Sequence, residues 1–277
     1  MEFRKLDETK VLKDPVHSYI HINYEVVWQC IDSKEFQRLR RIRQLGGDFQ
    51  VYPTAEHSRF SHSLGVYEIV RRMVTEIKSL SNELSEYDKV SVMLAGLLHD
   101  VGHGPFSHAF EHVTNHSHED YTVKIILGNT ELNAVLSKVS KNLPHDIVAI
   151  IQHTHKNDIL NQIVSGQLDA DRMDYLLRDS YFTATSYGQF DLERILRTMR
   201  VRKIDDDKKQ LVVKYTGIHS VEDYIMARYQ MYWQVYYHPV ARSYETVFIQ
   251  LFKRLNDIFK VNKDYFSDIK VLVPFLE

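Results

Sequence analysis

An adjacent histidine and aspartate, His99 and Asp100, end an apolar run that covers residues 87–101. Together they offer an imidazole nitrogen and a carboxylate oxygen at one place, which suits a divalent metal. Consecutive helical residues point about 100° apart, so both can reach one metal only where the helix ends, and Gly102 supplies that end. A buried carboxylate is also costly unless it is paired or bound to a metal. Two distant residues complete the predicted four-ligand set, His62 and Asp171.

Histidines are unusually dense after this dipeptide. Five follow within twenty positions: His103, His108, His112, His116 and His118. Imidazoles change charge near neutral pH and commonly transfer protons. Their concentration beside a predicted metal site indicates proton transfer there, although His112 and His116 fit a solvated loop equally well.

The elements that must position these residues are expected to be mostly helical, because the chain has few glycines (10) and prolines (6). Residues 66–80 carry an apolar stripe with helical period, and 87–101 is apolar on nearly all sides, as in a buried helix. The other predicted helices are a basic one at 32–45 and those at 119–127, 144–154, 169–178, 221–237 and 243–260. Alternation predicts a strand-like turn over 11–22 and a hairpin over 197–215 around the charged residues 205–209.

Composition limits the class of protein. The 277 residues are 44% hydrophobic, enough for a sizeable core, and the net charge of −2 gives no general argument for nucleic-acid or membrane binding. The single cysteine, Cys30, excludes an intramolecular disulfide and fits a reducing compartment. The N-terminus lacks an apolar signal core and no apolar run reaches membrane-spanning length, so we expect a cytoplasmic protein.

A histidine, a distant His-Asp pair and a more distant aspartate form the pattern of the HD-domain superfamily of metal-dependent phosphohydrolases, which this chain resembles. Longer stretches resemble its deoxynucleoside triphosphate triphosphohydrolase branch, whose enzymes split a dNTP into a deoxynucleoside and inorganic triphosphate. These stretches are residues 36–47, 59–66, 99–108, 118–119 and 168–179, and with the opening 10–17 the likeness runs over most of 10–260.

The resemblance implies a mainly α fold: an HD-domain helical core with a small β-hairpin and a short strand-like N-terminal segment. It divides the chain into an N-terminal segment with the basic helix (1–50), which would contribute allosteric or oligomer contacts, and a phosphohydrolase core (51–260). The apolar end, 271–277, is expected to be a strand cut short. Residues 261–277 would therefore begin a C-terminal lobe that is truncated or absent.

Phosphate binding requires cations. Arg59 lies one helical turn before His62, and the resemblance implies that it holds phosphate, as do Arg172 and Arg228. His103 would join the arginines in stabilising charge that builds on the phosphate. A surface ion pair is the alternative role for each arginine, and for Arg228 the two roles are evenly balanced.

Sugar recognition is implied for one helix face. Asp171, Tyr175 and Asp179 recur at four-residue intervals and so share a face. The resemblance implies that Tyr175 packs on the sugar, excluding a 2′-hydroxyl, and that Asp179 accepts a hydrogen bond from the 3′-hydroxyl. Ordinary aromatic packing is the alternative for Tyr175. Further matched positions that contact the nucleotide are Gln44, Leu45 and Tyr236.

The mechanism implied by the resemblance is in-line attack on the α-phosphorus by a water whose pKa the metal lowers. The leaving 5′-oxygen needs a proton, and we choose His108 as its donor, with Glu111 one turn later to orient it. The resemblance also places a second histidine–carboxylate pair, His118 and Glu119, in the pocket. The ligand set suits Mn, Fe, Zn, Ni or Co, and Mg could assist at the phosphates.

A second nucleotide site is also implied. Five residues match positions that bind an activating guanine nucleotide or dNTP between subunits of regulated relatives, which are homotetramers: Lys10, Val11, Asp32, Gln37 and Arg40. Two departures, Lys13 for asparagine and Asp48 for a third glycine, weaken the match. A solvated basic helix is the alternative.

Two other classes stay open. Another HD hydrolase, acting on a nucleoside monophosphate, a cyclic nucleotide or a guanosine alarmone, would use the same four ligands. A regulatory protein that binds nucleic acid through the basic helix is not favoured, because it need not keep the metal ligands.

Overall fold

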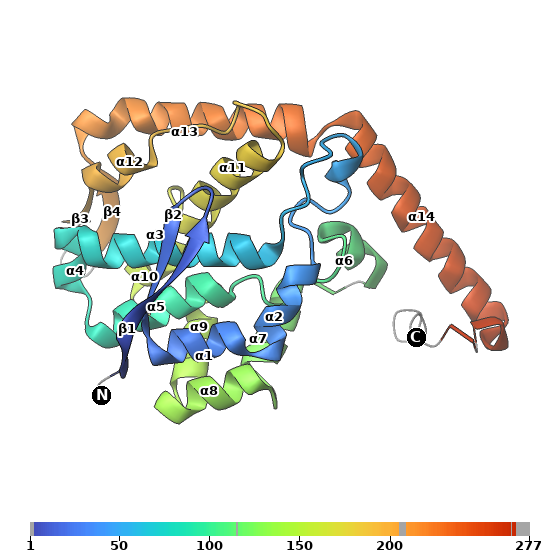
Figure 1. The fold of residues 1–277 in the computed structure, drawn as a ribbon, viewed down its shortest axis with the longest axis horizontal. Helices are drawn as coiled ribbons and strands as arrows, with labels where there is room; N and C mark the ends of the chain where they lie inside the picture. Colours follow the sequence, from blue (N-terminus) through green and yellow to red (C-terminus); the bar gives the residue numbers. More distant parts are fainter. Residues whose placement is uncertain (1–2, 115, 205–208, 267, 270–277) are drawn as a thin grey trace.

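The computed structural model describes residues 3–114, 116–204, 209–266 and 268–269. Helices dominate, as the sequence predicts (Figure 1). The longer helices are α1 (Glu25–Asp32), α3 (Arg59–Glu76), α5 (Glu86–Leu98), α7 (His118–Leu127), α8 (Glu131–Val139), α9 (Leu143–Ile151), α10 (Asp158–Ser165), α11 (Ala170–Phe182), α13 (Ile218–Met231) and α14 (Pro239–Val261). The shorter helical segments are α2 (Lys34–Gln37), η1 (Arg38–Arg41), η2 (Asp48–Gln50), α4 (Lys78–Glu83), α6 (His108–Thr114), α12 (Leu192–Thr198), η3 (Tyr215–Gly217), η4 (Tyr232–Tyr236) and η5 (Lys263–Phe266).

The core is built around two helices, α3 and α5, which pack against each other (Figure 1). The run from Val90 to Leu98 on α5 is buried on all sides, because this helix is apolar all round. A capping box between Ser85 and Asp88 fixes where α5 begins. Helix α11 packs on α3 and helix α9 packs on α5. The C-terminal end of α5 therefore lies close to the first turns of α3 and α11.

An antiparallel hairpin crosses this core at its N-terminal side. Strand β1 (Lys5–Asp14) pairs with β2 (Ser18–Tyr24), with Asp14 opposite Ser18 at the turn. Ser18 has a φ of 64°, in the left-handed region. The hairpin is fixed to α3, because Tyr67 donates to the carbonyl of His21 at 3.0 Å. The strand-like prediction for 11–22 is therefore confirmed as a complete hairpin.

A second hairpin, β3 (Met199–Lys203) with β4 (Lys209–Val213), confirms the prediction for 197–215. Its charged turn at 205–208 and the apolar end at 271–277 lie outside the described residues. Beyond it, α13, the π-helical segment η4 and α14 follow, and α14 extends away from the body (Figure 1). No described helix has the length and apolarity needed to cross a lipid bilayer.

The predicted helix at 32–45 is wrong as a single element. Asp32 ends α1, and the following segment is one α-helical turn continued by the 3₁₀ segment η1, which ends at Arg41. Its buried residues, Phe36, Leu39 and Ile42, are spaced three apart. That spacing matches the 3.0 residues per turn of a 3₁₀ helix rather than the 3.6 of an α-helix.

Candidate metal centre and nucleotide site

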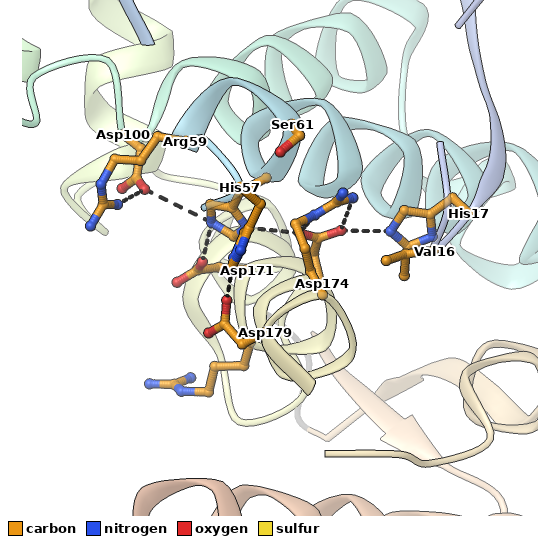
Figure 2. A network of polar contacts seen from close by, with 12 residues as sticks. Val16, His17, His57, Arg59, Ser61, Asp100, Asp171, Asp174 and Asp179 are labelled. Carbon is orange, nitrogen blue, oxygen red and sulfur yellow. Dashed lines mark hydrogen bonds and ion pairs between the residues drawn. The ribbon is translucent and has the colours of Figure 1, made fainter. Parts of the chain in front are cut away.

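The four predicted metal ligands converge. His62 lies in the first turn of α3, His99 caps the end of α5, Asp100 follows it and Asp171 lies in the first turn of α11. Nε2 of His62 is 3.1 Å from Oδ1 of Asp171 and 3.8 Å from Oδ2 of Asp100. Nε2 of His99 is 3.3 Å from Asp100 and 3.5 Å from Asp171. Three separate helices thus bring two imidazoles and two carboxylates to one point, as Figure 2 shows for both aspartates.

The two imidazoles are oriented for a cation. Nδ1 of His62 lies 2.8 Å from Asp174, and Nδ1 of His99 lies 2.9 Å from the carbonyl of Gly96. These contacts direct Nε2 of each ring toward the carboxylates. Both Nε2 atoms are buried, and neither has a hydrogen-bond partner among the described residues. Buried nitrogens of this kind, beside two carboxylates and held by outer contacts, are the donor set that a divalent metal needs.

Electrostatics of the cluster agree with a cation site. Burial would raise the pKa of Asp171, but the imidazoles of His62 and His99 hold that pKa well below its usual range. Burial lowers the pKa of His62, yet the carboxylates of Asp171 and Asp174 outweigh it and raise the pKa to about 10. The cluster therefore attracts positive charge, which a metal can supply in place of a proton.

Two of the predicted phosphate-binding arginines, Arg59 and Arg172, form hydrogen bonds with other residues of the protein. Arg59 is buried and donates to Asp100 and, at 2.8 Å, to the hydroxyl of Ser107. Its charge therefore adjoins a metal ligand. Arg172 donates to Asp169 and to the carbonyl of Gly166.

Arg172 also lines a cavity of about 500 Å³ between the segment 165–168 and strand β4. Arg228, half-buried on α13, lies 5.6 Å above the ring of Tyr232. The arginine contacts thus place Arg59 beside the metal ligands and give Arg172 and Arg228 other partners.

The histidine-rich segment lies beside Asp100. The rings of His103 and His118 stack at 3.8 Å, and ligand atoms of Asp100, His103 and His118 lie within 4.8 Å of one another. A cavity of about 350 Å³ adjoins both histidines. Glu111 contacts Nδ1 of His118 and accepts from its backbone N–H at 2.9 Å.

Within the described residues, Glu111, which we expect to orient His108, contacts His118, the first residue of α7. Glu119, expected to partner His118, is exposed instead. His108 lies in α6, but its side chain is outside the described part of the structure. His112 and His116 are exposed.

Three of the predicted nucleotide contacts lie together: Tyr175 and Asp179 on α11 and Tyr236 on η4. The ring of Tyr175 lies 6.5 Å from the His62 ring and 6.0 Å from the ring of Tyr236. The hydroxyl of Tyr236 donates to Oδ2 of Asp179 at 2.8 Å. Tyr175 therefore lies between the metal ligands and Asp179. The remaining matched residues, Gln44 and Leu45, are half-buried, and Oε1 of Gln44 has no hydrogen-bond partner among the described residues.

Sequence reasoning missed His57. Its Nε2 lies 2.8 Å from Oδ1 of Asp179 (Figure 2). Its ring stacks on Phe182, with the ring centres 4.6 Å apart. Both oxygens of Asp179 are thus engaged, one by His57 and one by Tyr236. No local spacing marks His57, because it precedes α3 in an irregular loop and its partner is 122 residues away.

The residues of the predicted second nucleotide site lie on four elements: Lys10 and Val11 on β1, Asp32 at the end of α1, Gln37 on α2 and Arg40 on η1. Val11 is 53% exposed, and Lys10 lies 5.9 Å above the ring of Trp28 on α1. Gln37 donates to the Ile31 carbonyl at 2.8 Å, and Arg40 donates to Gln37 at 2.8 Å.

Comparisons with known proteins cover most of the chain. The family profile described as HD domain matches residues 59–179, and that described as HD associated region matches 190–269. YwfO of Bacillus subtilis is 54% identical over 92% of this chain and 58% of its own length. The deoxynucleoside triphosphate triphosphohydrolase SAMHD1 homolog of Dictyostelium discoideum is 30% identical over 98% of this chain and 54% of its own.

A solved structure gives the same result for the fold. The crystal structure of a phosphohydrolase from Bacteroides thetaiotaomicron is 35% identical, with a TM-score of 0.81, over 91% of this chain and 60% of that one. This chain therefore spans a little more than half the length of these relatives.

Proposed function

Because the chain belongs to the HD-domain superfamily of phosphohydrolases, we propose that it hydrolyses dNTPs to a deoxynucleoside and inorganic triphosphate. One observation supports a dNTP as the substrate. The half-buried ring of Tyr175 lies beside the metal ligand His62, and Asp179 follows one turn later on the same helix face. A flat ring and a carboxylate at this spacing fit the face and the 3′-hydroxyl of a deoxyribose. The ring would leave no room for a 2′-hydroxyl.

The metal would be held by His62, His99, Asp100 and Asp171, whose atoms converge from three helices. Mn, Fe, Zn, Ni or Co fits this nitrogen and oxygen donor set, and Mg could accompany the phosphates. When bound, such a metal supplies Lewis acidity toward a phosphate ester. Arg59 would place a fixed positive charge beside the reacting phosphate, because it already contacts Asp100.

Arg172 and Arg228 are proposed to hold the outer phosphates. Arg172 adjoins the proposed ligand Asp171 on α11, and its side chain is 28% exposed while its ion-pair partner Asp169 is buried. The exposed part of this guanidinium would contact a phosphate while the ion pair with Asp169 holds it in place.

The leaving 5′-oxygen requires a proton, which we assign to a histidine of the segment that follows Asp100. His108 is the proposed donor, and His118, supported by Glu111 and stacked on His103, is the second candidate. His108→Ala should abolish turnover without changing metal content. Loss of metal in that variant would refute this division of roles, and full activity would transfer the role to His118.

We further propose that a guanine nucleotide or dNTP activates the chain as a homotetramer. The exposed Val11 and the contact chain from Ile31 to Arg40 fit a nucleotide site completed by a neighbouring subunit. Exposed aromatic side chains on α13 and η4, Tyr229 and Trp233 among them, fit surfaces that are buried on assembly. Sedimentation with and without GTP tests this assembly.

The experiment that tests the function is product analysis with each dNTP and each NTP in Mn²⁺, with and without GTP. Deoxynucleoside plus intact triphosphate from dNTPs alone is the expected result. Release of orthophosphate or pyrophosphate would indicate another HD hydrolase. Absence of turnover together with salt-sensitive retention of nucleic acid would favour a binding protein.

A further inference from the structure

The turn that joins β1 to β2 carries a buried histidine, although turns usually lie at the surface. The side chain of His17 is 3% exposed. Its Nε2 lies 2.6 Å from Oδ1 of Asp174, on the buried face of α11. Figure 2 shows His17 directed at Asp174 from the side opposite the metal ligands. The N-terminal hairpin therefore reaches into the centre of the molecule through one imidazole.

Asp174 joins this turn to a metal ligand. Its Oδ2 lies 2.8 Å from Nδ1 of His62, the nitrogen that does not face the metal site. Arg178, one turn later on α11, donates to both oxygens of Asp174, at 2.8 and 2.9 Å. The side chains of Asp174 and Arg178 are 0% exposed, so no water competes for these contacts. The carboxylate is held from three directions.

Arg178 also contacts the hairpin, through Asp14. It donates to Oδ2 of Asp14 at 2.8 Å and to Oδ1 at 3.2 Å. Asp14 in turn accepts the backbone N–H groups of Val16 and His17, each at 2.9 Å. The shape of the turn, the position of His17 and the orientation of Asp174 are thus fixed by one closed set of hydrogen bonds.

We propose that the β1–β2 turn is a positioning element of the metal site: His17, with Asp14 acting through Arg178, holds the Asp174 carboxylate in the orientation that fixes the His62 ring. The inference rests on the metal site of the proposed function. Partners of a ligating imidazole set the direction of its metal-binding nitrogen, and their loss weakens metal binding about 10- to 100-fold. His17 and Asp14 do not contact His62 themselves. The hairpin holds the Asp174 carboxylate through them, His17 by its own contact and Asp14 through Arg178.

The test measures Mn²⁺ affinity of the full chain by calorimetry, without substrate. His17→Ala should weaken binding about tenfold, near the lower end for groups outside the ligand shell. His17→Gln places an amide N–H near the position of Nε2 and should restore most of the affinity. His21→Ala is the matched control, because His21 lies on the same hairpin and contacts Glu68 on α3, the helix that carries His62, 3.2 Å away. Among the described residues, His21 contacts neither Asp174 nor a proposed metal ligand. That control should bind Mn²⁺ as the unsubstituted chain does.

Three results would overturn the proposal. These are unchanged affinity in His17→Ala, no recovery in His17→Gln, or an equal loss in His21→Ala, which would indicate general packing of the hairpin. Should His17→Ala fail to fold, the Mn²⁺ affinities of His17→Gln and His17→Asn are compared instead, because the shorter asparagine cannot reach Asp174. Equal affinities of these two variants would reject the proposal. An unsubstituted chain that binds Mn²⁺ but releases no deoxynucleoside would reject the proposed function alone.

Discussion

Gly65→Ala should disrupt the buried ion pair between Asp174 and Arg178. Gly65 lies on α3, three residues after His62, where Asp174 and Arg178 approach the helix backbone. A Cβ at this position would lie 1.8 Å from Oδ1 of Asp174 and 2.4 Å from Nη2 of Arg178. Neither distance is tolerable, so the carboxylate would have to move by more than about 1 Å to reach even a tight van der Waals contact. The added methyl group therefore acts on the ion pair rather than on apolar packing.

The magnitude follows from the contacts that would break. Oδ1 of Asp174 lies 2.6 Å from Nε2 of His17 and 2.9 Å from Nη2 of Arg178. Hydrogen bonds to charged groups contribute about 1.5–3 kcal/mol each, and disrupting a buried ion pair costs about 3–5 kcal/mol. Alanine regains up to about 1 kcal/mol of helix propensity. We expect a net loss of about 2–4 kcal/mol in the free energy of unfolding.

Urea denaturation of the full chain measures this loss, and Gly96→Ala on α5 is the control. A Cβ at Gly96 would lie 2.9 Å from a Val70 methyl group and 3.4 Å from a Val66 methyl group. Overpacking of apolar side chains costs about 1–3 kcal/mol and alanine regains up to about 1 kcal/mol of helix propensity, so the control should lose about 0–2 kcal/mol, less than Gly65→Ala. Equal stability of Gly65→Ala and the unsubstituted chain would refute the reasoning. An equally large loss in Gly96→Ala would show that helix crowding, and not the ion pair, is responsible.

Three further predictions concern single side chains. Burial, with the charges of Glu245 and Asp179, raises the pKa of Asp48 to about 7; because the unfolded carboxyl ionises near pH 4, its contribution to stability falls as pH rises from about 4 to 7. Asp48→Asn should therefore raise the melting temperature at pH 8 more than at pH 4.5, and equal shifts at both would contradict this. Asp171→Asn should lower metal content by about 100-fold while the circular dichroism spectrum is retained, and a full complement of metal would remove Asp171 from the ligand set. Tyr175→Val should raise the ratio of NTP to dNTP turnover by at least about tenfold, and an unchanged ratio would leave Tyr175 a packing residue.

Most of the helices and the His-Asp pair at the end of α5 could be predicted from the sequence because their signals are local, whereas His62 and Asp171 join the predicted ligand set through the resemblance to the HD-domain pattern. The apolar run of α5, the stripe of α3 and the adjacent His99 and Asp100 each lie within a few helical turns. The basic segment after Asp32 was mispredicted because its charges suggested one α-helix, while its buried apolar residues Phe36, Leu39 and Ile42 recur every three residues, as in a 3₁₀ helix.

The network behind the metal ligands could not be predicted, because its contacts join distant parts of the chain. His17 and Asp174 are 157 residues apart, and His57 and Asp179 are 122 apart. No periodicity relates them. The contact between Glu111 and His118 was not predicted either, because a helical turn relates Glu111 to His108, whereas His118 begins the next helix. Spacing identifies residues on one element, whereas pairing between elements requires the fold.

The most direct test of the proposed activity is hydrolysis of a dNTP in ¹⁸O-labelled water with Mn²⁺, followed by mass spectrometry of both products. In the proposed reaction, attack of water at the α-phosphorus would break the bond between that phosphorus and the 5′-oxygen. We therefore predict a single ¹⁸O in the inorganic triphosphate and none in the deoxynucleoside. Label in a nucleoside monophosphate or in orthophosphate would contradict it.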